Sequence, residues 1–213
     1  MATQANAQEK RPQHRARRET NASREARIAR TVSDTYSHRY EIFGGGGFLR
    51  FTPGQYLKKD SQVSWAADTT YFLHPKFGLT ASAQGSFGHA ETLPFNTSGG
   101  YVSSAQINEY YFLAGPSYRF YMREKVALTA RAQAGIGWGI FGGGSKGFLP
   151  EDVGLWKDQT RPAWSLNLNG DYNFYPNMAF RVTPTYIGTS YGSKMQSNFG
   201  FNAGFVYRFG RQQ

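Results

Sequence analysis

The chain has 213 residues and a formal net charge of +10, yet only 18% of its residues are charged. It contains 25 glycines and 16% aromatic residues, a composition unlike that of an α-helical globule, which keeps glycine out of helix interiors. No run of about 18 apolar residues occurs, which excludes a transmembrane helix. The chain has no cysteine, so disulfides, thiolate zinc sites and a cysteine nucleophile are excluded as well.

The first 37 residues differ in composition from the rest, being rich in arginine and free of glycine. A short helix is predicted from Asn21, a residue type favoured at N-caps, to about residue 37. We interpret 1–37 as a basic extension. It is either a solvated tail or, over 8–37, a contact with an anionic surface or a partner protein. Nucleic acid is not expected as a partner, because the extension lacks interleaved aromatic residues.

Ala5-Asn6-Ala7, followed by Gln8, has the small-x-small pattern at which secretory signal peptides end. The apolar stretch that normally precedes such a pattern is not in the sequence. We therefore expect residues 1–7 to be the remainder of an export signal.

Beyond residue 38, apolar and polar residues alternate with a period of two, as in β-strands, whose successive side chains point to opposite faces. The clearest example places Phe201 and Phe205 on one side and Asn202 and Arg208 on the other. In the first segment Gly44 to Gly47 blur the alternation, and we expect a bend or β-bulge there. Eight strands are predicted, over 40–51, 62–73, 77–88, 106–121, 126–140, 163–175, 178–189 and 199–209.

The connections between these segments alternate in length. Residues 74–76, 122–125 and 176–177 are short turns, whereas 52–61, 91–100 and 142–160 are long. The last link, 192–195, is short. Short turns on one rim and longer loops on the other are typical of outer-membrane β-barrels. We therefore predict an all-β fold over 38–210, an eight-stranded antiparallel up-and-down barrel, with 211–213 as a C-terminal tail.

Period-two alternation fits both a membrane barrel, whose apolar face points outward, and a lipocalin-like soluble barrel, whose apolar face points inward. We favour the membrane barrel because the apolar faces of the clear strands contain no charge and the polar faces almost no lysine. The charged residues on the polar faces are predicted to form a lumenal ion network. Its members are Glu41, Asp68, Glu109, Arg119, Arg131, Asp171, Arg181 and Arg208.

This network has two interpretations. Arginines interleaved with carboxylates can fill and stabilise the lumen as a structural plug, which we favour. The alternative is a narrow channel for ions or small solutes, opened by rearrangement of the same residues.

Three stretches, Gly115–Phe120, Phe180–Tyr186 and Asn202–Phe209, resemble those of small eight-stranded outer-membrane β-barrel proteins, akin to the transmembrane domain of the outer-membrane protein A family. The resemblance covers about 38–210. It implies a bacterial outer-membrane protein with both termini in the periplasm and the lipid bilayer as its partner. It leaves the oligomeric state open. By the same resemblance, Phe205, Tyr207 and Phe209 look like the C-terminal insertion signal of such barrels.

Some barrels of this kind are lipid-modifying or proteolytic enzymes, which is a further alternative for this chain. Only His89, with Ser86 and Glu91 nearby in sequence, could supply a nucleophile, a base and an acid. The chain has no Gly-x-Ser-x-Gly motif and no metal-ligand spacing. We therefore expect neither enzymatic activity nor a cofactor, and a role that is structural or adhesive through the outer loops.

Overall fold

The computed structural model describes residues 21–55, 57–91, 104–143, 149–191 and 195–211. Its regular elements are α1 (Asn21–Tyr36), β1 (His38–Phe51), β2 (Asp60–His74), β3 (Phe77–Glu91), β4 (Ser104–Met122), β5 (Val126–Gly143), the 3-10 helix η1 (Pro150–Val153), β6 (Gln159–Tyr175), β7 (Met178–Thr189) and β8 (Gln196–Arg211).

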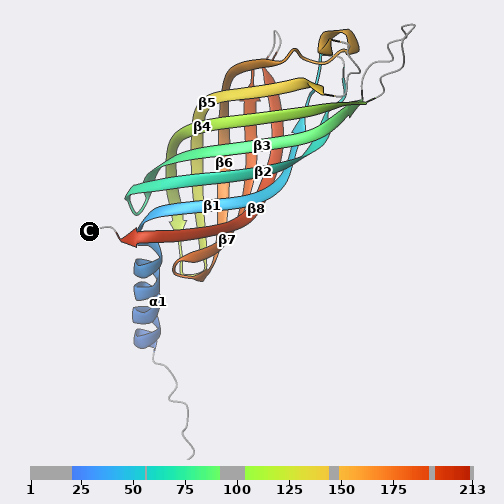
Figure 1. Ribbon diagram of the computed structural model, residues 1–213. Helices are drawn as coiled ribbons and strands as arrows, with labels where there is room; N and C mark the ends of the chain where they lie inside the picture. The colour runs from blue at the N-terminus through green and yellow to red at the C-terminus, as the bar shows by residue number, and fades with distance from the viewer. Residues whose placement is uncertain (1–20, 56, 92–103, 144–148, 192–194, 212–213) are drawn as a thin grey trace, which may run out of the picture.

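The eight strands form a closed barrel in which each pairs with its neighbours in the sequence and β1 closes on β8 (Figure 1). All eight pairings are antiparallel. Closure leaves no free sheet edge, so every strand finds hydrogen-bond partners on both sides. The predicted eight-stranded up-and-down barrel is confirmed.

The two rims of the barrel differ as predicted. The three short turns lie at one end, here called the turn rim, together with α1 and the C-terminal end of β8 (Figure 1). At the other end, the loop rim, lie η1, the end of β3 and the beginning of β4 (Figure 1). No helix among the described residues is long and apolar enough to cross a membrane.

The prediction of a bend or bulge at Gly44 to Gly47 is wrong, because β1 stays in unbroken register with both β2 and β8 through these residues. Gly45 and Gly47 are needed for a different reason: a Cβ at either would overlap the backbone of Ala203 or Phe201 on β8. The register irregularities lie near strand ends instead, between Phe72 and His74, Gln106 and Asn108, Arg119 and Tyr121, and Asn173 and Tyr175.

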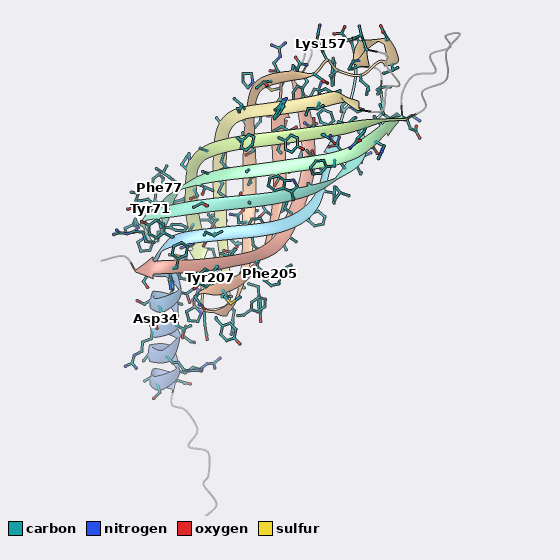
Figure 2. The ribbon with its side chains drawn as sticks, viewed as in Figure 1. Asp34, Tyr71, Phe77, Lys157, Phe205 and Tyr207 are labelled. Atoms are coloured by element: carbon teal, nitrogen blue, oxygen red, sulfur yellow. The ribbon has the colours of Figure 1, made fainter. Side chains whose placement is uncertain are left out.

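The outer surface of the barrel is apolar. Side chains predicted to face outward do so, including Phe112 (51% exposed) near the middle of β4 and Phe205 (61% exposed) on β8. Tyr71, Phe77 and Tyr207 lie among the aromatic residues near the turn rim (Figure 2). A second aromatic group, nearer the loop rim, contains Tyr110 and Trp138, whose ring centres are 5.9 Å apart. Two aromatic girdles around an apolar band are typical of transmembrane barrels.

Two tryptophans of the outer surface lie across outward-facing glycines on neighbouring strands. Trp65 is in register with Gly85, and Trp164 with Gly188. A Cβ at either glycine would overlap the facing indole, so the glycine allows the ring to lie flat against the sheet. Such cross-strand pairs fix strand register.

The lumen is less polar than the sequence predicted. Apolar side chains form clusters within it, one near the turn rim with Phe43 and Val206, and one further along with Leu49 and Tyr111. A third, at the loop rim, includes Phe51, Phe141 and Tyr191. An eight-stranded barrel leaves just enough interior for side chains to fill, and here apolar and polar groups share that space.

Candidate functional site

Five charged side chains meet in the lumen near the turn rim and form what we call the charge cluster: Glu41, Arg119, Asp171, Arg181 and Arg208. Each lies on a strand near its turn end and points inward, and all five are buried. The cluster joins β1, β4, β6, β7 and β8 across the barrel.

Glu41 is the centre of the charge cluster. Its carboxylate accepts hydrogen bonds from Arg119 Nη2 (3.1 Å) and Arg208 Nε (2.9 Å), and from Arg181 Nη2. Asp171 receives a bidentate pair from Arg181, Nε to Oδ1 at 2.6 Å and Nη2 to Oδ2 at 2.8 Å, and a third bond from Arg208 Nη2 at 2.9 Å. Charged groups buried in this way stabilise a structure only when they are fully paired.

Three arginines against two carboxylates leave one positive charge in excess, and the end of α1 lies beside it. The Arg119 guanidinium carbon is 4.9 Å from the centre of the Tyr36 ring and 4.0 Å from that of Phe72, distances typical of cation–π contacts. Tyr36 is the last residue of α1, so the negative end of the helix dipole lies at this end of the lumen.

Tyr36 closes the turn-rim end of the lumen. Its hydroxyl donates to the carbonyl oxygen of Arg123 (2.8 Å) and accepts from Asn173 Nδ2 (3.0 Å), while Asn173 Oδ1 accepts from Arg208 Nη1 (2.9 Å). Burial raises the pKa of Tyr36 above its ordinary value. The hydroxyl therefore stays protonated, and able to donate, at a pH where an exposed tyrosine ionises. No sequence pattern indicates this contact, because Tyr36 lies in the predicted extension.

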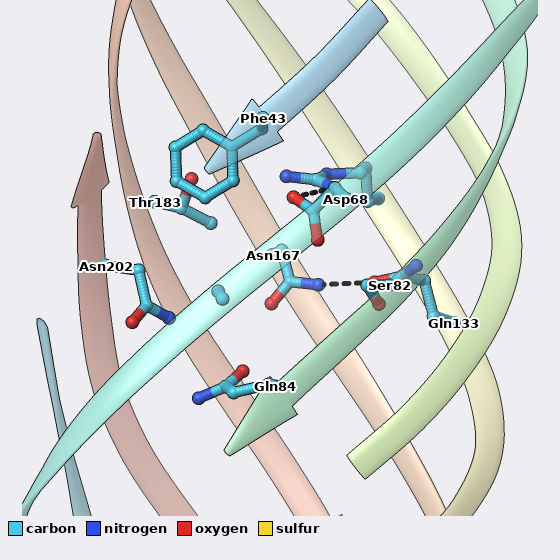
Figure 3. A pocket seen from close by; sticks show the side chains of 10 residues that line it. Phe43, Asp68, Ser82, Gln84, Gln133, Asn167, Thr183 and Asn202 are labelled. Carbon is cyan, nitrogen blue, oxygen red and sulfur yellow. Dashed lines mark hydrogen bonds and ion pairs between the residues drawn. The ribbon is translucent and has the colours of Figure 1, made fainter. Parts of the chain in front are cut away.

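Arg131 and Asp68 form a separate ion pair deeper in the lumen, with Nη1 and Oδ2 2.7 Å apart. Arg131 Nη2 also donates to Asn169 Oδ1 at 2.7 Å. The pair borders a cavity of about 20 Å³, whose other walls include Gln84 and Asn202 (Figure 3). A space of this size holds about one water molecule, so the middle of the lumen is packed rather than open.

Glu109 lies apart from the other residues of the predicted network. It is ten residues from Arg119 on β4, about 33 Å along the strand at about 3.3 Å per residue. Its Oε2 accepts from Ser86 Oγ at 3.3 Å, and no ion pair to it occurs among the described residues. The structure thus divides the eight predicted residues into the charge cluster, the Arg131–Asp68 pair and Glu109.

The loop-rim end of the lumen is covered by the segment that contains η1. Val153 and Leu155 are buried against Phe51 and Phe141, and Trp156 packs against the same cluster. Trp156 bridges to the β1–β2 connection: its indole Nε1 donates to the carbonyl oxygen of Thr52 (3.0 Å), and its backbone N–H to that of Pro53 (3.0 Å). Polar and apolar contacts therefore hold this segment over the outer end of the barrel.

The residues considered for catalysis do not come together. Ser86 faces the lumen and is buried, whereas His89, three residues further along β3, faces outward and is exposed. An odd spacing along a strand places two side chains on opposite faces, so His89 cannot accept the Ser86 proton. In the described part of the chain no three His, Asp or Glu side chains are grouped as metal ligands require.

The predicted insertion signal lies on the outer face of β8. Phe205, Tyr207 and Phe209 are all exposed there, and Phe209 stacks on Tyr40 of β1 with ring centres 5.3 Å apart. β8 continues to Arg211, which pairs with His38. The recognition role of these aromatics remains a prediction. Residues 1–7, the predicted signal remnant, lie outside the described residues.

Comparison with solved structures identifies the fold. The outer membrane protein OprG of Pseudomonas aeruginosa matches with a TM-score of 0.60 and 14% identity, covering 82% of this chain and 98% of that one. Neisserial surface protein A matches with a TM-score of 0.58 and 12% identity, covering 80% and 97%. The chain has the fold of the small outer-membrane β-barrels. The predicted resemblance to that class is confirmed.

A third match is the attachment invasion locus protein Ail of Yersinia pestis, solved in complex with the heparin analogue sucrose octasulfate. Its TM-score is 0.52 and its identity 18%, covering 81% of this chain and 99% of that one. The sequence matches no protein-family model and no curated protein. At these identities the likeness concerns the fold, so the function has to be argued from this chain's own residues.

Proposed function

We propose that this protein is an outer-membrane barrel with a filled lumen that serves as a structural or surface-interaction protein and conducts no solute. The observation that carries the proposal is the charge cluster closed by Tyr36. The Arg131–Asp68 layer and the apolar cluster under η1 fill two further levels of the lumen. A channel would need a continuous open path, and three successive layers of packed side chains close it.

Planar-bilayer recording tests the filled lumen. The purified protein is expected to give no sustained unitary conductance at either voltage polarity, because each layer would have to rearrange at once for an ion to pass. Insertion is checked on the same preparation by heat-dependent gel mobility and by flotation with lipid vesicles. Sustained unitary currents from inserted protein would instead support the alternative, a narrow ion or small-solute channel.

We further infer that the turn rim faces the periplasm, because short turns lie on that side in barrels of this class. Both termini then lie in the periplasm, and α1, which projects from the barrel (Figure 1), presents its exposed Arg24, Arg27 and Arg30 there. A helix with this charge suits an anionic surface or an acidic partner protein.

Trypsin added to intact cells is expected to spare these arginines and to cleave there once the outer membrane is permeabilised. Cleavage in intact cells would show that the turn rim faces the outside of the cell instead.

Replacing Arg24, Arg27 and Arg30 by glutamine is expected to reduce the amount of partner protein or anionic material that co-purifies with the protein from native membranes. If the same material is recovered from the variant, α1 is not the contact.

A further inference from the structure

Four polar residues lie close together on the outward face of the barrel, where β7, β8 and β1 reach the loop rim. Lys59 Nζ donates to the carbonyl oxygen of Ser197 at 3.2 Å, which brings the lysine from the β1–β2 connection to β8. Ser197 Oγ and the Tyr186 hydroxyl are hydrogen-bonded at 2.6 Å. Arg50 is exposed on the same face of β1 and is in register with Phe199, two residues from Ser197. We call Arg50, Lys59, Tyr186 and Ser197 the rim site.

The rim site has hydrogen-bond donors to spare. Lys59 uses one of three ammonium donors on Ser197, and Arg50 offers up to five. Whichever hydroxyl donates within the Tyr186–Ser197 pair, the other proton is free for a further acceptor. Among the described residues no carboxylate pairs with Arg50 or Lys59. The nearby Asp60 lies on the inward side of β2 and caps the backbone N–H of Ser61.

An apolar groove of about 390 Å³ runs down the outer surface next to the rim site. Its outward-facing walls come from Leu166 and Leu168 of β6, Pro184 and Tyr186 of β7, and Phe199 of β8. Tyr186 belongs to both the groove and the rim site, and its ring centre is 4.7 Å from that of Phe199. The cations therefore lie at the loop-rim end of a slot that faces hydrocarbon.

The geometry points to a binding site for a phosphate-bearing lipid of the leaflet at the loop rim, with one acyl chain in the groove and its phosphate on Arg50 and Lys59. Guanidinium and ammonium groups are the side chains that hold phosphate best. Their place above an apolar slot on the lipid-facing surface suits an amphiphile better than a soluble anion or a protein. The groove volume lies within the range of pockets that hold small ligands, about 300–1,000 Å³.

The test uses the full-length protein folded in an uncharged detergent, with diphosphorylated lipid A as the probe and native mass spectrometry as the readout. The wild-type protein is expected to retain one lipid per barrel. The double variant Arg50→Ala/Lys59→Ala is expected to bind at least about tenfold more weakly, since hydrogen bonds between charged groups are the strong ones. Leu168→Trp, which fills the groove and leaves every charge in place, is expected to weaken binding as well.

Lys157→Ala is the matched control, because Lys157 is an exposed cation of the same rim that pairs with Glu151 and follows Trp156 in the segment that covers the lumen. It should bind lipid like the wild type. The proposal is overturned if Lys157→Ala weakens lipid binding as much as the double variant does, or if the double variant binds like the wild type. It is also overturned if dephosphorylated lipid A binds equally well, or if millimolar inorganic phosphate displaces the lipid. Gel mobility shows that every variant is folded. Lipid binding in micelles does not depend on whether the barrel conducts ions or on its orientation in the membrane. A negative result in this test would therefore leave the proposed function unaffected.

Discussion

Replacing Glu41 by alanine is expected to lower the free energy of unfolding by about 3–5 kcal/mol, the cost of removing one partner from a buried ion pair. Glu41 receives hydrogen bonds from Arg119, Arg181 and Arg208, and all four side chains are buried. Without it Asp171 is the one carboxylate left against three arginines, so the excess of buried positive charge rises from one to two and Arg119 loses its carboxylate partner, while Arg181 and Arg208 keep Asp171.

Urea titration of the protein folded in lipid vesicles, followed by gel mobility, measures this change. Glu151→Ala is the matched control, because Glu151 also pairs with a cation, Lys157, at 3.4 Å but both side chains are exposed. An exposed pair contributes about 0–1 kcal/mol. If the two variants lose the same stability, the charge cluster does not hold the barrel together, and the structural interpretation of the lumen fails.

The strands and their outward faces could be predicted from the sequence because alternation is a local property. Phe201 and Phe205 share one face whatever the rest of the chain does, because side chains two positions apart lie on the same side of a strand. The outward direction of that face is predicted from charge, which in 199–209 is confined to the opposite face. The turn rim follows from short connections in the same way. Here local pattern and overall fold agree, as they do in sequences that fold reliably.

The partners within the lumen could not be predicted in this way. Glu41 and Arg208 are 167 residues apart in sequence, and their contact depends on how β1 meets β8 on closure. Counting residues from the short turns does predict that six charged residues lie in the turn-rim half of the lumen, namely Asp68, Arg119, Arg131, Asp171, Arg181 and Arg208. The count does not say which arginine meets which carboxylate. Depth follows from strand register, which a one-residue slip would change for every side chain of a strand.

Apolar residues in the lumen escaped prediction for a related reason. Phe43 and Phe51 alternate in phase with Glu41 on β1, so a strand with aromatic residues on both faces carries no signal of which face is inside. Gly45 and Gly47 lie between these two aromatic residues on the same face of β1. A Cβ at either glycine would overlap the backbone of β8. Tyr36 was missed because it precedes the first strand and its partners, Arg123 and Asn173, lie in or beside distant turns.

Phe112→Arg is expected to destabilise the barrel in lipid vesicles by about 2–4 kcal/mol, the cost of an arginine on the lipid face near the bilayer midplane. Phe112 is 51% exposed and lies near the middle of β4, between the two aromatic girdles. Hydrocarbon offers the guanidinium no water or counter-ion within reach, so the side chain must extend to an interface or draw water inward.

Phe77→Arg is the matched control, because Phe77 is 41% exposed and begins β3 at the turn rim. An arginine there reaches the headgroups, and the expected cost falls to about 0–1 kcal/mol. The difference between the two variants in urea titration depends on depth in a bilayer and on little else, since both make the same chemical change on the same face. In a barrel surrounded by water, an arginine at either position would meet solvent and the two costs would be alike. Equal costs would therefore place the apolar face in water and remove the membrane from the account of this protein.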